Sequence, residues 1–147
     1  GNRESTRFEM RHKIDPAPGI ELWQQSNPPI LSMAPLVASL AMFDKVGIDA
    51  IRSKSQRLTG YLRTLIESHL AGRVHIITPA ANQGAQLSLR IVDHHVSGRA
   101  VFESLERQHV ICDWREPDVI RVAPAPLYNN FTDVWTFVQR LDRAMQP

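Results

Sequence analysis

The sequence of 147 residues has a single cysteine, Cys112, so no disulfide can form within it. A single free thiol is compatible with a reducing compartment, so the sequence favours a cytoplasmic location. Long apolar runs are missing too, because none approaches the roughly 20 residues that a bilayer-spanning helix needs. The first seven residues mix both signs of charge and lead into no apolar segment, unlike a secretory signal. We therefore expect neither a disulfide framework nor a membrane partner.

Concentrated charge is also missing. The formal net charge is +2, and the 17 Lys and Arg residues are scattered instead of forming a stripe that could follow phosphates. The six histidines show no metal-ligand spacing, since His94 and His95 are adjacent and the others are isolated. Neither nucleic acid nor a metal ion is expected as a partner.

What is present is the size and apolar content of one globular domain, with 43% hydrophobic residues. Two prolines and a glycine between Asp15 and Gly19, followed by Pro28 and Pro29, predict a linker over residues 1–29. Apolar periodicity predicts helices over 30–46, 48–70, 97–108 and 132–145, and strands over 74–77, 85–92, 110–112 and 119–122.

The order of these elements predicts the fold of residues 30–147. The strands are too few and too close in sequence for a doubly wound parallel sheet. We expect an α+β fold, a small and largely antiparallel sheet with helices packed on one face. Gly47 is placed to stop the first helix, and Ser97 and Thr132 are predicted N-caps. The helix over 30–46 is apolar on nearly every side, which is typical of a helix between two layers or two protein bodies.

Three segments carry more than a periodic pattern. They are residues 5–10 (Ser-Thr-Arg-Phe-Glu-Met), residues 26–31 (Ser-Asn-Pro-Pro-Ile-Leu), and residues 113–131, which begin Asp-Trp-Arg-Glu-Pro and end Leu-Tyr-Asn-Asn-Phe. In identity, order and spacing these segments resemble the kynureninase family, and the likeness covers almost the whole chain. Two positions depart from the family: Gln83 stands where arginine is usual, and Asn130 where serine is usual.

The resemblance implies the C-terminal small domain of an aspartate-aminotransferase-like, fold type I enzyme that uses pyridoxal phosphate and acts as a homodimer. The family hydrolyses L-kynurenine or 3-hydroxykynurenine to anthranilate or 3-hydroxyanthranilate plus L-alanine, in tryptophan catabolism. Its cofactor lysine lies in the large domain, upstream of the region that this chain resembles. We therefore expect no covalently bound cofactor and no turnover from this chain alone.

Arg121 is the main candidate for a site residue. It lies in a strand that should be half buried, and a guanidinium there needs a partner because an unpaired buried charge is costly. One interpretation is a bidentate grip on the α-carboxylate of the substrate. The alternative is a structural salt bridge to one of three nearby acids, Asp113, Glu116 or Asp118. The resemblance implies the carboxylate grip.

Two more candidates precede the first helix. Asn27 is followed by proline, so its backbone is held extended and its amide can project into a cleft. The alternative is that Ser26 and Asn27 form a turn or cap. The resemblance implies that Asn27 binds the cofactor and Ser26 the substrate. Cys112, in an apolar run, is interpreted as a packed thiol because nothing nearby in sequence supplies an activating base.

A function of another class fits the same pattern. A stand-alone α+β ligand-binding or regulatory module without catalysis would have a similar fold, and a fold alone does not determine function. The helix over 30–46 argues against this alternative, because an independent module would have to leave its apolar surface partly exposed.

Overall fold

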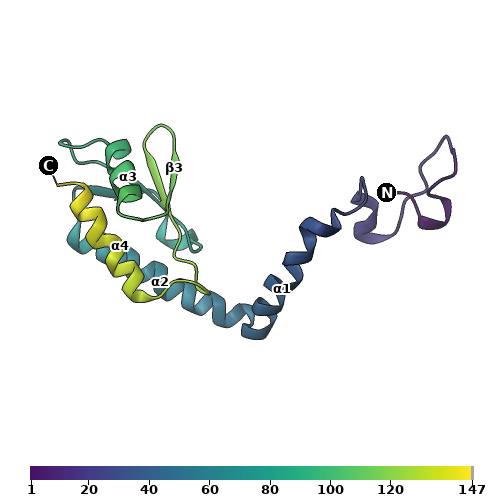
Figure 1. Ribbon diagram of the computed structural model, residues 1–147, viewed down its shortest axis with the longest axis horizontal. Coiled ribbons are helices and arrows are strands. Elements are labelled where there is room, and N and C mark those ends of the chain that lie inside the picture. Colours follow the sequence, from purple (N-terminus) through teal and green to yellow (C-terminus); the bar gives the residue numbers. More distant parts are fainter. Residues whose placement is uncertain (147) are drawn as a thin grey trace. The chain divides into compact units, whose positions relative to one another are not determined.

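The computed structural model describes residues 1–146, which form two compact units, Gly1–Lys45 and the part from Val46 onward (Figure 1). The first unit has two short 3-10 helices, Glu4–Thr6 (η1) and Gly19–Trp23 (η2), and most of helix Ile30–Val46 (α1). The second unit has helices Ile48–His69 (α2), Gly98–Arg107 (α3) and Phe131–Ala144 (α4), strands Val74–Ile76 (β1), Leu87–Ile91 (β2), Asp113–Arg115 (β3) and Val119–Val122 (β4), and the 3-10 turn Ala80–Asn82 (η3).

The four strands form one sheet in the order β1-β2-β4-β3, and every neighbouring pair is antiparallel. In the central pair, Leu87 lies opposite Val122 and Leu89 opposite Ile120. All four side chains are buried. They lie on one face of the sheet, because alternate residues of a strand point to the same face. The residue pair between them, Ser88 and Arg121, therefore lies on the other face. The register thus separates a core face from a polar face.

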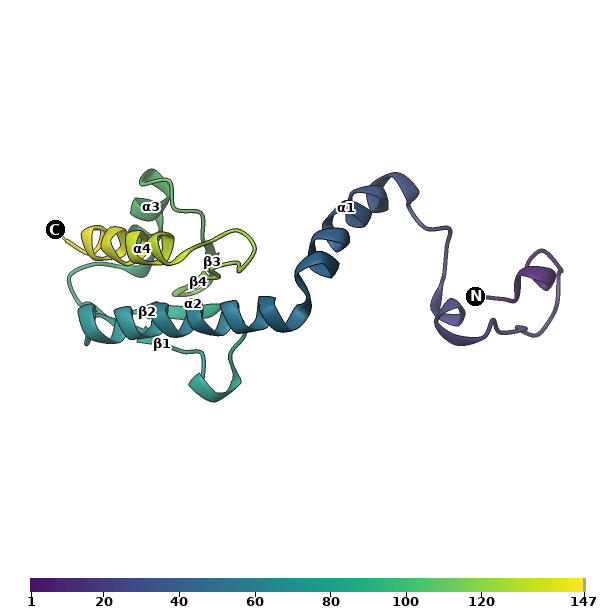
Figure 2. The ribbon, with the colours of Figure 1, turned by 90° about the horizontal axis from the view of Figure 1, so that it is seen from below.

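The core face of the sheet is covered by helices α2, α3 and α4. Helices α2 and α4 lie side by side in both ribbon views (Figure 2). All three helices contribute fully buried apolar side chains to one cluster with the strands, among them Leu58, Leu62, Leu105, Val138 and Leu141. The predicted α+β fold, an antiparallel sheet with helices on one face, is confirmed.

Most helix ends follow the sequence signals. The break between α1 and α2 is Gly47, whose φ of 81° lies in the left-handed region that glycine tolerates. The Ser97 hydroxyl accepts a hydrogen bond from the backbone N–H of Ala100 at 3.2 Å, so this predicted N-cap is confirmed. The prediction that Thr132 caps α4 is wrong. Asn130 takes that place, because its side chain and that of Asp133 form a reciprocal capping box.

The predicted strand over residues 110–112 is also wrong. The backbone N–H of Val110 is bonded back to Leu105 at 3.0 Å, so this residue still completes the end of α3. Pairing with β4 begins only at Asp113, opposite Arg121. Ile111, in the middle of the predicted strand, is fully exposed. The β-branched side chain of Ile111 indicated a strand at this position. The residues that form β3 are instead set by the register in which β3 pairs with β4.

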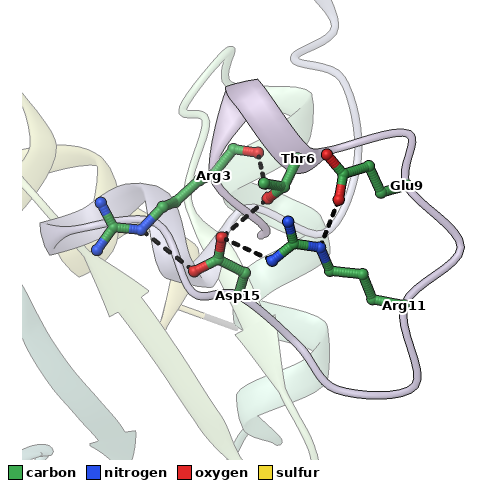
Figure 3. A network of polar contacts seen from close by, with 5 residues as sticks. All are labelled: Arg3, Thr6, Glu9, Arg11 and Asp15. Carbon is green, nitrogen blue, oxygen red and sulfur yellow. Dashed lines mark hydrogen bonds and ion pairs between the residues drawn. The ribbon is translucent and has the colours of Figure 1, made fainter.

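In the first unit, Asp15 closes the chain into a loop (Figure 3). Its carboxylate accepts a hydrogen bond from the Thr6 hydroxyl at 3.1 Å and pairs with Arg3 at 3.2 Å and Arg11 at 3.5 Å. The backbone N–H of Arg3 also donates to the carbonyl oxygen of Asp15 at 2.8 Å. These bonds give the predicted linker a local fold without strands or α-helices.

Apart from Ser32, Ser39, Asp44 and Lys45, helix α1 consists of apolar residues, and none of its side chains is buried against the rest of its own unit. Among residues 1–146 no single helix is long and apolar enough to cross a membrane, although α1 and α2 together, with the break between them, would meet that requirement.

Candidate functional site

Arg121 lies on the polar face of the sheet, in the central strand β4. Its neighbours in sequence, Ile120 and Val122, are buried on the core face, and its own side chain is 30% exposed. Arg121 is therefore half buried, as we expected from the sequence. Across the sheet it lies opposite Ser88 of β2 on one side and Asp113 of β3 on the other.

The guanidinium of Arg121 is held by Asp113. Its Nε donates to Oδ2 of Asp113 at 2.6 Å, and its Nη2 donates to the same oxygen. Oδ2 also accepts a hydrogen bond from Nε of Arg115 at 2.9 Å. The hydrogen bonds from Arg121, helped by the one from Arg115, hold the pKa of Asp113 below its usual range. The carboxylate therefore stays ionised between two arginines.

Only one of the three acids considered from the sequence pairs with Arg121. Asp118 pairs instead with Arg90 at 2.7 Å, and Glu116 accepts a hydrogen bond from the indole of Trp114 at 2.8 Å. The salt bridge that we considered as the alternative is thus present, and its partner is Asp113.

This ion pair leaves part of Arg121 free. A guanidinium has five N–H donors in a planar fork, with one bidentate edge at Nε and Nη2 and another at the two Nη atoms. Asp113 contacts the first edge, whereas Nη1 has no hydrogen-bond partner within residues 1–146. The second edge can therefore bind another carboxylate while the pair with Asp113 persists.

Ser26 and Asn27 lie in the first unit, so no geometry relates them to Arg121. The amide oxygen of Asn27 accepts a hydrogen bond from the guanidinium of Arg7. The backbone carbonyl of Ser26 accepts one from the Gln24 side chain at 2.9 Å, and Ser26 lines a cleft of about 360 Å³. Arg7 was not singled out from the sequence. The signal that could have identified it is its place in the 5–10 segment, which resembles the kynureninase family.

Gln83, one of the two departures from the family pattern, is held by Arg63 of α2. Nη2 of Arg63 donates to the side-chain oxygen of Gln83 at 2.9 Å and to the carbonyl oxygen of Thr78 at 2.7 Å. The Thr78 hydroxyl in turn accepts a hydrogen bond from the N–H of Ser88 at 2.8 Å. Arg63 thus fixes the loop between β1 and β2 against the helix layer.

The sequence did not predict a second cleft, of about 830 Å³, in the unit that begins at Val46. It lies between α4 and the segments that follow α3 and β4, and Cys112, Pro124 and Phe137 are among its lining residues. None of the three lysines of the chain lines this cleft or the smaller one. Among residues 1–146 no group of three His, Cys, Asp or Glu side chains could hold a metal ion.

Cys112 should react slowly with alkylating reagents. Burial, helped by the carboxylates of Glu106 and Asp113, raises the pKa of its thiol to about 11, so the neutral thiol predominates below that pH. At pH 8 we expect iodoacetamide to modify the folded chain roughly a hundredfold more slowly than the urea-unfolded chain, and the rate should rise with pH towards 11. Mass spectrometry of timed samples measures both rates. Equal rates at pH 8 would mean that the thiol is not shielded.

Comparisons with known proteins identify a matching family and similar curated proteins. The family described as "Kynureninase C-terminal domain" matches residues 51–141. Kynureninase from Xanthomonas euvesicatoria is 51% identical and that from Stenotrophomonas maltophilia 52% identical, each over 97% of this chain and 34% of the relative. The chain thus spans about a third of the length of these curated relatives.

Two solved structures share the fold at low sequence identity. A NifS-like protein superposes with a TM-score of 0.64 at 14% identity, over 81% of this chain and 34% of its own. A C-DES mutant with glycine covalently linked to its PLP cofactor superposes with a TM-score of 0.63 at 22% identity, over 89% of this chain and 33% of its own. Both matches extend the likeness in fold to proteins outside the curated relatives.

Proposed function

This chain belongs to the kynureninase family, and on that premise we propose that it is the C-terminal part of a pyridoxal-phosphate-dependent hydrolase. The proposed reaction cleaves L-kynurenine or 3-hydroxykynurenine to anthranilate or 3-hydroxyanthranilate and L-alanine. Two-thirds of the length of the curated relatives lies outside the match, so this reaction is assigned to the whole protein. The part of it assigned to this chain is the binding of the substrate's α-carboxylate.

The observation that carries the proposal is the unoccupied edge of Arg121. A kynurenine-type substrate has one α-carboxylate, and a planar guanidinium edge binds it through two parallel hydrogen bonds. The side chain is 30% exposed and fixed on its other edge by Asp113, so it is both reachable and oriented. Holding the carboxylate there would fix the orientation of the bonds at Cα, which is how positioning accelerates a reaction.

The residues of this chain do not by themselves fit pyridoxal phosphate. Covalent attachment needs a lysine in a pocket, and Lys13, Lys45 and Lys54 line neither cleft. We therefore assign the cofactor to the part of the protein that the relatives have in addition.

Two finer residue assignments belong to the same proposal. Asn27 is assigned to the cofactor pocket, with its amide held by Arg7, and Ser26 to the substrate. Both rest on the resemblance of residues 26–31 to the family. A homodimer and a cytoplasmic location likewise stay predictions from the sequence.

Helix α1 supports the place of the chain in a larger protein. Its side chains include Leu31, Val37 and Phe43, and none of them is buried within its own unit. An apolar surface of this kind needs cover from outside that unit. We propose the large domain or a second subunit as that cover, and residues 1–29 as the linker that enters the small domain formed from residue 30 onward.

The full-length protein that carries this chain should release anthranilate and alanine from L-kynurenine when supplied with pyridoxal phosphate. Fluorescence of the anthranilate product measures the rate, and a parallel assay with 3-hydroxykynurenine ranks the two substrates by kcat/KM. If neither substrate is cleaved while the protein is folded and loaded with cofactor, the proposed reaction is wrong.

The isolated chain is the matched control for this assay. It should not cleave either substrate, and borohydride reduction in the presence of pyridoxal phosphate should leave no stoichiometric adduct on Lys13, Lys45 or Lys54. Peptide mapping detects such an adduct. Finding it on a single lysine would contradict the assignment of the cofactor to the rest of the protein.

A further inference from the structure

We propose that Asp113 is a positioning residue for substrate binding: it holds one edge of the Arg121 guanidinium and thereby presents the other edge to the α-carboxylate. This inference rests on the proposed function, because it assumes that Arg121 binds the substrate. It assigns to Asp113 a role beyond the structural salt bridge, since the ion pair would set the direction of the binding group.

The geometry of the pair is suited to this role. Both hydrogen bonds run from the Nε and Nη2 edge of Arg121 to a single oxygen of Asp113, Oδ2. Nη2 carries two hydrogens, so one remains for a ligand beside those of Nη1. An arginine without such an anchor would lose side-chain entropy each time it bound a carboxylate. The anchored side chain has already lost most of that freedom.

Asp113 is itself anchored by Arg115. Nε of Arg115 reaches the same Oδ2 at 2.9 Å, and the register of β3 with β4 keeps Asp113, Arg115 and Arg121 on one face of the sheet. Two guanidinium groups share one carboxylate, so the cluster keeps a net positive charge. A carboxylate ligand would therefore meet a cation that is oriented but not neutralised.

The opposite role is also testable, because Asp113 carries the same charge as the ligand. If Asp113 occupied the place of the substrate carboxylate, its removal would free Arg121 and tighten binding. If it positions Arg121, its removal would weaken binding, and only for ligands that have the carboxylate.

The experiment uses Asp113→Asn in the full-length protein, a substitution that keeps the size of the side chain and removes its charge. We expect KM for L-kynurenine to rise by about tenfold, the effect of losing one charge-assisted hydrogen bond. The inhibition constant of the corresponding amine, which lacks the α-carboxylate, should stay unchanged. Asp113→Glu should restore part of the loss, because the carboxylate returns at a different reach. A role in stability alone would not separate the two ligands.

Arg115→Ala is the second variant, and because its side chain is exposed we expect the fold to stay intact. It should raise KM by a few fold in the same ligand-selective way, because Asp113 loses one of its two anchors. Asp118→Asn is the matched control, since this acid pairs with Arg90 and makes no bond to Arg121. It should leave KM for L-kynurenine unchanged.

The outcomes separate this inference from the proposed function. A normal kcat/KM in Arg121→Ala would refute the carboxylate grip and the positioning role with it. A large loss in Arg121→Ala beside an unchanged or lowered KM in Asp113→Asn would refute the positioning role alone. An equal loss of affinity for the substrate and for the amine in Asp113→Asn would also refute it, because the effect would not pass through the carboxylate.

Discussion

Replacing Arg121 with alanine in the full-length protein should lower kcat/KM for L-kynurenine by a factor of at least about thirty. The reason is that truncating one partner of a hydrogen-bonded charge pair costs roughly 2 to 5 kcal/mol, and each 1.4 kcal/mol is about a factor of ten. The ion pair with Asp113 does not weaken this expectation, because it leaves one edge of the guanidinium for the substrate. Steady-state kinetics with the purified variant measures the change.

Arg121→Lys should recover only part of that loss. An ammonium group keeps the charge but cannot donate two parallel hydrogen bonds from a planar edge. The melting temperature of both variants must be recorded beside their kinetics, because a purely structural salt bridge predicts a different result. In that case the variants would lose thermal stability and keep a nearly normal kcat/KM in the folded fraction, and Arg121 would have no place in the site.

Leu141→Ala should produce the largest loss of stability among the variants considered, with little change in kinetics. Leu141 is fully buried in α4 and packs in the cluster between the helices and the sheet. Leucine-to-alanine changes in a core cost about 2 to 5 kcal/mol, because contacts are lost and a cavity remains. In a domain of this size that corresponds to a fall in melting temperature of at least about 8 °C.

Arg143→Ala is the control on the same helix. Its side chain is exposed near the end of α4, so the free energy of unfolding should change by no more than about 0.5 kcal/mol. Urea unfolding followed by circular dichroism compares the two variants. A loss in Leu141→Ala no larger than that in Arg143→Ala would mean that α4 does not close the core as described.

The local elements of the fold were largely predictable because their signals are local. The apolar spacing in α2 and the position of Gly47 set the bounds of that helix to within a residue or two. Ser97 acts as a cap through a hydrogen bond to a residue three positions away, which a sequence pattern records directly. At α4 the pattern predicted Thr132 as the cap, but the structure places the cap two residues earlier, at Asn130.

The sequence singled out candidate site residues but not their arrangement. Arg121 was identified because a charge in a half-buried strand requires a partner, and the sequence offered three acids as that partner. The choice of Asp113 depends on the register of β3 with β4, which the sequence had placed wrongly by starting the strand at Val110. The bond between Arg7 and Asn27 joins residues 20 positions apart, and no periodic pattern records such a contact.

The sequence by itself determined the family, the α+β class, the positions of most helices and the identity of the charged residue that needs a partner. Only the tertiary structure decided which acid holds Arg121 and which edge of its guanidinium stays open. The physical reason is that periodicity and capping act within a few residues, whereas strand register and ion pairing depend on segments brought together by burial of the core. Arg121 and Asp113 face each other only because Ile120 and Val122 are buried on the opposite side of the same strand.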